Sequence, residues 1–257
     1  MTLRYSTGVR NFMAGRGSFK NAFQGGRIEI YTGAQPATAD AAVTGTLLCT
    51  ITSSSLAITA EVLSSGTVTL ATGAAGSVDT VTVNGVNILG GSVPYNTSLT
   101  QTAADVAAKC QDNQSTVEYT VTSSGAVITI TAMPGTGAGP NGFVVAATST
   151  TITTTVANMA GGVASVNGLL YGTPSAAVLS KLAAQTWTGV NAATGTAGYY
   201  RMYGSVADAG GVDSALTTIR EDGAIATSGA ELNMSATAFT SAATTTISTW
   251  QRTFPTL

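Results

Sequence analysis

The sequence contains no histidine, only two cysteines and few charged residues. Without imidazole the chain cannot build a Ser-His-Asp or Cys-His catalytic group, or a metal site with histidine ligands. Cys49 and Cys110 are too few for a disulfide framework, and their separation favours reduced, buried thiols. These absences predict a protein that is not an enzyme and has no cofactor.

Long apolar segments are also missing. Residues 1–10 lack the apolar stretch of a secretory signal. No run of about 18 apolar residues occurs anywhere in the chain, so we expect no membrane partner. The sequence therefore predicts a protein that is made, and assembled with its partners, in a cytoplasm.

Charged residues make up 9% of the chain, against about 25% in ordinary soluble proteins. A weakly charged surface disperses a free monomer poorly, whereas a protein inside an assembly tolerates it. Hydrophobic residues make up 44% and recur throughout, which disordered chains lack. The composition therefore indicates a folded protein that works within a larger structure.

Basic residues are concentrated at the N-terminus, where half of the ten precede the first acid, Glu29. They are Arg4, Arg10, Arg16, Lys20 and Arg27. A basic arm over residues 1–27 can dock on an acidic protein surface or on nucleic acid. Its interleaved Gly and Phe residues favour a protein partner, and a solvated segment is the alternative.

The middle of the chain has the alternating pattern of β-strands. Polar and apolar residues alternate over 67–70 and 78–83, and Asn84-Gly85 then predicts a two-residue hairpin turn. A helix follows, for which Thr102 and Asp105 fit a capping box. Earlier in the chain, Ser18 is placed to cap a shorter helix.

These elements predict a mainly β protein with two parts. We expect an inserted α+β subdomain over 66–162, with one helix, because Gly- and Ser-rich seams flank it. It interrupts an outer β domain made from 1–65 and 163–257. Many short strands favour a β-sandwich or jelly roll for the outer domain, with Asp222-Gly223 as a hairpin turn.

Aromatic residues gather in the second outer segment. They are Trp187, Tyr199, Tyr200 and Tyr203. Such side chains serve as core anchors and interface contacts, or as a platform on which sugars stack. The first interpretation is favoured, since aromatic side chains bury large areas in cores and interfaces.

Three further patterns carry weak chemical signals. Ser180 and Lys181 are neighbours, but adjacent strand residues point to opposite faces. The Gly-rich stretch 135–142 lacks the Lys-Ser/Thr of a phosphate-binding loop. Calcium binding by scattered acids lacks any recognised spacing; these acids are Asp208, Asp213, Glu221 and Asp222. The sequence therefore predicts no catalytic, cofactor-binding or metal-binding residues.

Several blocks of the sequence resemble a family of structural proteins from tailed bacteriophages and prophages. The blocks are residues 6–11, 25–33, 195–204 and 222–234, and residues 100–107 are similar to a module that recurs in phage virion proteins. The resemblance covers most of the predicted outer domain. It implies a virion structural protein and brings no catalytic residues with it.

The resemblance and the composition together predict a capsid decoration or cement protein. Its partner would be the major capsid protein or another virion protein, and a homo-oligomer, such as a trimer, suits capsid symmetry. The chain would then be located in the virion. A tail, collar or baseplate protein is one alternative, and a carbohydrate-binding adhesin is another.

Overall fold

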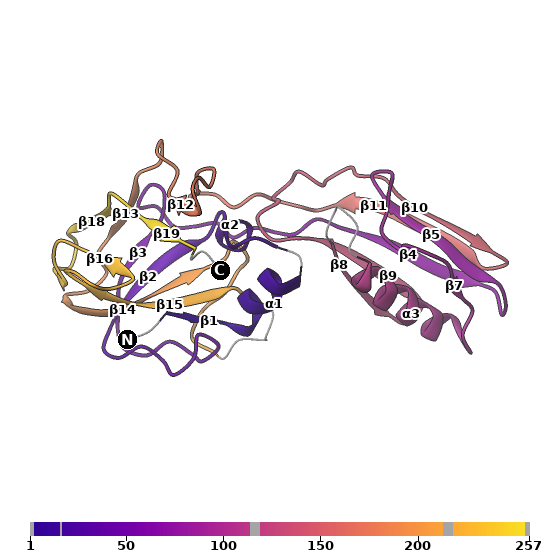
Figure 1. Ribbon diagram of the computed structural model, residues 1–257, viewed down its shortest axis with the longest axis horizontal. Coiled ribbons are helices and arrows are strands. Elements are labelled where there is room, and N and C mark those ends of the chain that lie inside the picture. Colours follow the sequence, from indigo (N-terminus) through magenta and orange to yellow (C-terminus); the bar gives the residue numbers. More distant parts are fainter. Residues whose placement is uncertain (1–2, 16, 114–118, 213–217, 255–257) are drawn as a thin grey trace. The chain divides into compact units, whose positions relative to one another are not determined.

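The computed structural model describes residues 3–15, 17–113, 119–212 and 218–254 (Figure 1). Strands hold 44% of the residues and helices 12%. The strands form several antiparallel sheets. The predicted fold class, mainly β with few helices, is therefore confirmed.

The chain divides into two compact units. The first, here the outer unit, combines Met1–Glu61 with Ser165–Leu257. The second, the inserted unit, is Val62–Ala164. The sequence predicted the boundaries of the inserted unit between residues 65 and 66 and between residues 162 and 163. In the structure these boundaries lie after Glu61 and after Ala164.

The outer unit is built on a seven-stranded sheet, five strands of which lie in the order β1-β15-β14-β2-β3. Two short strands complete it: β16 pairs with β15, and β17 pairs with β14. Its elements are β1 (Arg4–Tyr5), α1 (Thr7–Gly15), α2 (Phe19–Phe23), β2 (Arg27–Thr32), β3 (Leu47–Ile51), β12 (Val178–Ser180), β13 (Trp187–Val190), β14 (Gly195–Tyr203), β15 (Arg220–Ala226), β16 (Leu232–Asn233), β17 (Ala238–Phe239), β18 (Thr244–Ile247) and β19 (Gln251–Thr253). Neighbouring strands of the seven-stranded sheet pair antiparallel, except that β16 pairs parallel with β15.

One face of this sheet packs on the apolar core of the outer unit. Ile28, Ile30 and Met202 contribute from the sheet, because alternate strand residues point to the same face. The opposite layer consists of α2 and of two small sheets, β12–β19 and β13–β18, and it supplies Phe23 and Trp187 among others. The outer unit is thus a sandwich-like β fold.

The described residues of the segment 1–27 form part of this fold, so the prediction of a basic arm that projects for docking is wrong for them. Strand β1 pairs with β15, and Val9, Phe19 and Phe23 are buried in the core. The predicted cap is confirmed, since the hydroxyl of Ser18 accepts a hydrogen bond from the backbone N–H of Asn21. The aromatic pair on α2 is buried against the sheet, which is why the segment is anchored.

Asp222 and Gly223 lie inside β15, so the hairpin turn predicted there is wrong. Asp222 opposes Arg201 and Gly223 opposes Tyr200 on the neighbouring strand. A Cβ atom on Gly223 would meet the Tyr200 ring at 2.5 Å. Glycine is therefore needed at this position for packing room and not for a turn.

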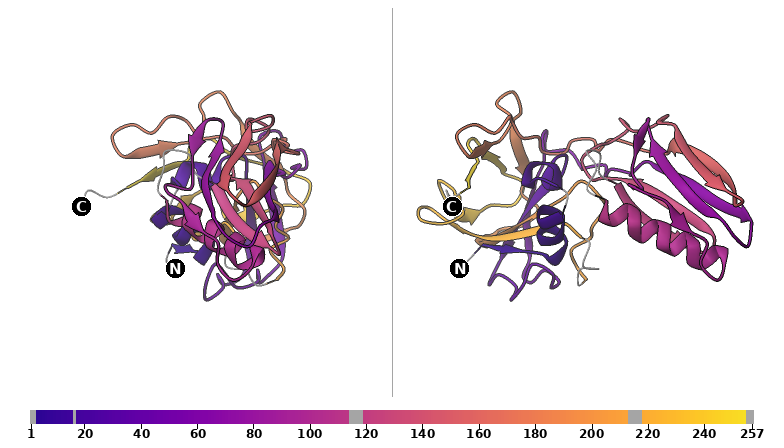
Figure 2. Two further views of the ribbon diagram at one scale, coloured as in Figure 1. Left: turned by 90° about the vertical axis from the view of Figure 1, so that its right-hand side faces the viewer. Right: turned by 45° about the vertical axis from the view of Figure 1, so that its right-hand side comes forward.

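The inserted unit has two four-stranded sheets and one helix. Its elements are β4 (Ser65–Thr72), β5 (Ser77–Val83), β6 (Val86–Asn87), β7 (Val93–Pro94), α3 (Leu99–Asp112), β8 (Tyr119–Ser124), β9 (Val127–Ala132), β10 (Val145–Thr150) and β11 (Thr153–Ala160). One sheet has the order β11-β4-β9-β8, and in the other β10, β6 and β7 pair with β5. Figure 2 shows α3 lying along the first sheet.

Local signals in this unit were mostly sufficient. Asn84 and Gly85 have positive φ angles of 49° and 80° and join β5 to β6, which confirms the predicted hairpin. The predicted cap of α3 is wrong, because the helix begins one turn earlier. Ser98 caps it by accepting a hydrogen bond from Gln101 N–H, and Thr102 is a buried residue of the first turn.

Candidate functional site

The second face of the seven-stranded sheet carries a row of charged residues on four adjacent strands. From β1 to β2 the members are Arg4, Asp222, Arg201 and Glu29, which oppose one another so that the sign of the charge alternates. Arg201 donates from Nε and Nη2 to both oxygens of Asp222 over 2.6 and 2.7 Å, and neither side chain is exposed. This forked pairing is the strongest geometry for an ion pair.

A second group of charges lies beside the first row. Arg220 donates to both oxygens of Asp208 over 2.6 and 2.8 Å. Arg27 donates to Glu29 over 2.6 Å, and its guanidinium lies 4.0 Å from the centre of the Tyr203 ring. Each cation of this group therefore has an internal partner.

The segment 34–45 provides main-chain oxygens for this charged face. The carbonyl oxygens of Pro36, Asp40 and Ala41 accept hydrogen bonds from three arginines of the face, which are Arg4, Arg220 and Arg201 respectively. Buried arginine is tolerated only when its donors are used in this way. The face is therefore an internal polar layer and not an open binding surface.

Burial and pairing compete in setting the pKa values of these acids. Burial would raise the pKa of Asp208, but the hydrogen bonds from Arg220 and from the Gly210 N–H outweigh it and hold that pKa below its ordinary value. For Asp222 burial prevails and raises the pKa despite the contact with Arg201. The pKa values of the two acids therefore shift in opposite directions, although each carboxylate accepts a forked pair of hydrogen bonds from an arginine.

Glu221 lies on the opposite face, within the apolar core. Its Oε1 atom accepts hydrogen bonds from the Tyr200 hydroxyl at 2.7 Å and from Arg252 at 2.5 Å. Its Oε2 atom has no hydrogen-bond partner among the described residues. Burial raises the pKa of Glu221 to about 7, against the attraction of Arg252. Glu221 is a buried acid whose pKa lies well above the ordinary value of a glutamate, and its side chain is closed to solvent.

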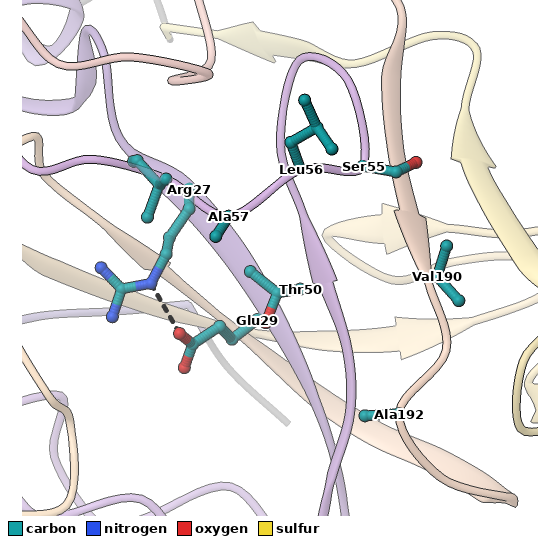
Figure 3. Close-up of a pocket in the computed structure, with 9 residues that line it drawn as sticks. Arg27, Glu29, Thr50, Ser55, Leu56, Ala57, Val190 and Ala192 are labelled. Atoms are coloured by element: carbon teal, nitrogen blue, oxygen red, sulfur yellow. Dashed lines mark hydrogen bonds and ion pairs between the residues drawn. The ribbon is translucent and has the colours of Figure 1, made fainter.

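A groove opens where the charged layer reaches β3 (Figure 3). It encloses about 320 Å³. The Arg27–Glu29 pair and Thr50 lie at one side, and the loop 55–58 faces Val190 and Ala192 across it. Leu56 and Val190 are 64% and 52% exposed, so apolar side chains form the rim.

The groove has the chemistry of a contact site. Its ion pair is already satisfied, because Glu29 also accepts a hydrogen bond from the Tyr31 hydroxyl and Arg27 donates to the Asp208 carbonyl. A charged ligand would find no free counter-charge there. Exposed methyl groups at the rim instead favour an uncharged, partly apolar segment of a partner.

The predicted docking residues are dispersed over the outer unit. Arg27 is buried, and Arg4 is half-buried in β1. Arg10 is exposed on α1, 4.0 Å from Asp40, and Lys20 is half-buried on α2. Arg16 lies outside the described residues. The four that the structure describes form no single basic surface, because the sheet and the helices direct them to different places.

The four aromatic residues proposed as interface contacts are buried. Trp187, Tyr199, Tyr200 and Tyr203 are all 0% exposed. The rings of Tyr199 and Tyr31 stack, and Trp187 packs in the core beside Trp250. They are core residues of the outer unit, and the idea of a sugar-stacking platform is wrong for them.

The other chemical candidates also have structural roles. The ammonium group of Lys181 donates a hydrogen bond to the main-chain carbonyl of Gln185. Asp208, Glu221 and Asp222 each pair with a different arginine, so the structure does not bring them together as calcium ligands. Asp213 lies outside the described residues. Within those residues no three acid or cysteine side chains meet in a metal-binding group.

The cysteines are buried and form no disulfide with each other. Burial raises the pKa of Cys49 to about 11, which makes its thiol a poor nucleophile. Among the described residues, no helix has the length and apolar character needed to cross a membrane.

The fold and the groove define a mainly β protein of two units with internally paired charges. Comparison of the chain with protein-family models, with curated proteins and with solved structures finds no match. Its function must therefore be argued from its own surfaces.

Proposed function

We propose that this protein is a structural component of a bacteriophage virion, most directly a capsid decoration protein that stabilises the head through protein–protein contacts. The observation that carries the proposal is the position of the charges. Four of the ion pairs of the outer unit have both side chains at most 13% exposed. Since these charges are directed inward, the surface is left poor in charge, which suits lasting contact with other subunits.

The groove supplies a second argument for contact. Its rim residues Leu56 and Val190 are large, apolar and exposed. Exposed apolar side chains around a hollow are a common anchor of protein interfaces. The proposed partner is a shell protein, which inserts an uncharged segment into the groove.

Binding to purified particle parts tests the proposal. Labelled full-length chain is mixed separately with emptied, expanded heads and with tails, and each mixture is sedimented. Decoration predicts saturable binding to heads and none to tails. Binding to tails alone would favour a tail or baseplate role, and binding to neither would refute a place in the virion.

A pair of matched variants tests the groove. Val190→Lys places a charge at the rim, and Val212→Lys places the same charge at a valine that is 67% exposed and does not line the groove. We expect Val190→Lys to weaken head binding at least about tenfold, because a lysine buried in a contact loses its hydration. Equal binding by the two variants would exclude the groove from the contact.

A further inference from the structure

Threonine predominates on one face of the β11-β4-β9-β8 sheet. The opposite face packs on α3 and on the apolar core through residues such as Val68 and Ile130. Alternation along the strands directs the remaining side chains outward. Directly opposed residues form three rows, which are Thr122–Thr129–Thr67–Ala157, Ser124–Val127–Thr69–Thr155 and Thr120–Thr131–Ser65. This set is called the threonine face below.

No member of the threonine face is charged, and all are exposed or half-buried. The described charges of the inserted unit lie elsewhere. Asp105, Lys109 and Asp112 belong to α3, which covers the other side of this sheet. Asp79 belongs to β5 in the second sheet, where Ser77, Ser92 and Thr150 donate hydrogen bonds to it. Among the described residues, the face is thus an uncharged patch of small side chains.

The chemistry of the threonine face restricts what can cover it. A charged partner would lose hydration and meet no counter-charge. A purely apolar partner would leave hydroxyl groups unpaired. A second threonine face satisfies both demands, because methyl groups meet methyl groups and each hydroxyl both donates and accepts. Two identical flat faces also pack about a two-fold axis without repulsion.

The size of the face limits the strength of such a contact. Four strands and three side-chain rows give a footprint of about 400 Å², from the usual strand and residue spacings. A stable interface buries about 800 Å² on each partner. A contact of half that size forms when copies are held close together, as on one particle, and not between dilute free chains.

We propose that the threonine face is a self-association surface, which packs against the same face of a neighbouring copy on the particle. The inference rests on the proposed function, because the particle supplies the high local concentration. It adds a second kind of contact to the one made by the groove. Decoration subunits would then be joined to one another as well as to the shell.

Disulfide trapping of the full-length chain bound to expanded heads tests this proposal, because the particle holds copies close together and oxidation accumulates a weak contact. Thr129→Cys and Thr67→Cys place a thiol at the centre of the face. Thr148→Cys is the matched control, since Thr148 is an exposed threonine that opposes Thr80 on the second sheet. The native cysteines are buried. We expect dimers of the first two variants to form at least about tenfold faster than dimers of the control.

A glutamate introduced on the threonine face provides a second test of the self-association. Adding Thr67→Glu to Thr129→Cys should abolish the faster dimer formation, whereas adding Thr148→Glu should leave it unchanged. Equal trapping of all three added-cysteine variants would overturn the inference, even where the wild-type chain binds heads. Loss of head binding by Thr129→Glu without any trapping would also overturn it, since a different partner would then cover the face. Absence of wild-type binding to heads and tails would instead refute the proposed function.

Discussion

The two units achieve β-sheet stability in different ways. The outer unit holds nine of the ten basic residues and eight of the twelve acids, and all five ion pairs found among the described residues lie within it. The inserted unit has an apolar core of aliphatic residues and sheets whose outer positions are mostly threonine.

The difference follows from what covers each sheet. The seven-stranded sheet is covered on both faces, and its second face uses buried, forked ion pairs because the charges there cannot reach water. The threonine face has no such cover, so hydroxyl groups suffice. The low overall content of charge is therefore unevenly distributed. Charged residues are structurally essential in the outer unit and few in the inserted unit.

The largest effect is expected from breaking a buried ion pair in the outer unit. Arg201→Ala leaves Asp222 buried without its partner and should lower the free energy of unfolding by about 3–5 kcal/mol. Arg10→Ala is the control, because Arg10 is a mostly exposed arginine whose pair should contribute less than about 1 kcal/mol. Urea unfolding followed by tryptophan fluorescence measures both. A similar small loss in both variants would contradict the role given to the charged layer.

A core truncation should act on the inserted unit alone. Ile130→Ala removes buried volume and should cost about 3 kcal/mol, whereas Thr129→Ala on the exposed face should cost about 0.5 kcal/mol or less. Both tryptophans belong to the outer unit. We therefore expect Ile130→Ala to shift the far-ultraviolet circular dichroism transition and leave the fluorescence transition in place. A common shift in both signals would show that the units unfold together.

Glu221 should make stability depend on pH. Its pKa is raised from 4.5 to about 7 in the folded protein, so the folded state retains the proton over a wider range than the unfolded chain. The resulting stabilisation is complete below about pH 4.5 and is lost as the pH rises through 7, an effect of about 3 kcal/mol.

Glu221→Gln separates this effect from the titration of other groups. The amide keeps an acceptor for the Tyr200 hydroxyl but does not titrate, so the variant should lose less stability than the wild type between pH 4.5 and 7. The fluorescence transition at several pH values measures the difference. Parallel profiles of the two proteins would place the titration elsewhere.

The smallest effect concerns two hairpin turns of the same geometry. In the inserted unit the turn is Asn84-Gly85, whereas in the outer unit Ala176 and Ala177 adopt φ angles of 48° and 60° between Ser175 and Val178. Alanine is strained in this conformation. Ala177→Gly should therefore stabilise the outer unit by about 0.5–1 kcal/mol in the same unfolding assay. A destabilised variant would show that the alanine side chain has a packing role.

Local signals in the sequence were sufficient for some elements and not for others. The Asn84-Gly85 turn and the Ser18 cap depend on neighbouring residues, and both are confirmed. Asp222-Gly223 has the local signature of a turn, but Asp222 pairs with Arg201, 21 residues away, and Gly223 makes room for a ring on the same distant strand. Long-range pairing thus prevailed over the local preference.

The candidate site could not be predicted from the sequence, because it also depends on contacts between distant residues. The groove unites residues near 27–29, 50–58 and 190–192, which no spacing rule connects. Arg27 with Glu29 and Arg220 with Asp222, each pair at alternating positions of the sequence, were signs of a charged internal layer. The sequence singled out four large aromatic residues but could not show that they are buried core residues and not interface contacts, because their burial follows from the packing of both sheet faces.

The central claim is that this chain makes its contacts with uncharged surfaces because its charges are paired internally. The salt dependence of its binding to heads tests this claim most directly. Binding of the full-length chain to expanded heads is measured by sedimentation at ionic strengths from about 0.05 to 0.5 M, a range in which screening weakens exposed charge contacts strongly. The account predicts an affinity that stays constant or rises slightly with salt. A steep loss of binding as salt increases would contradict it.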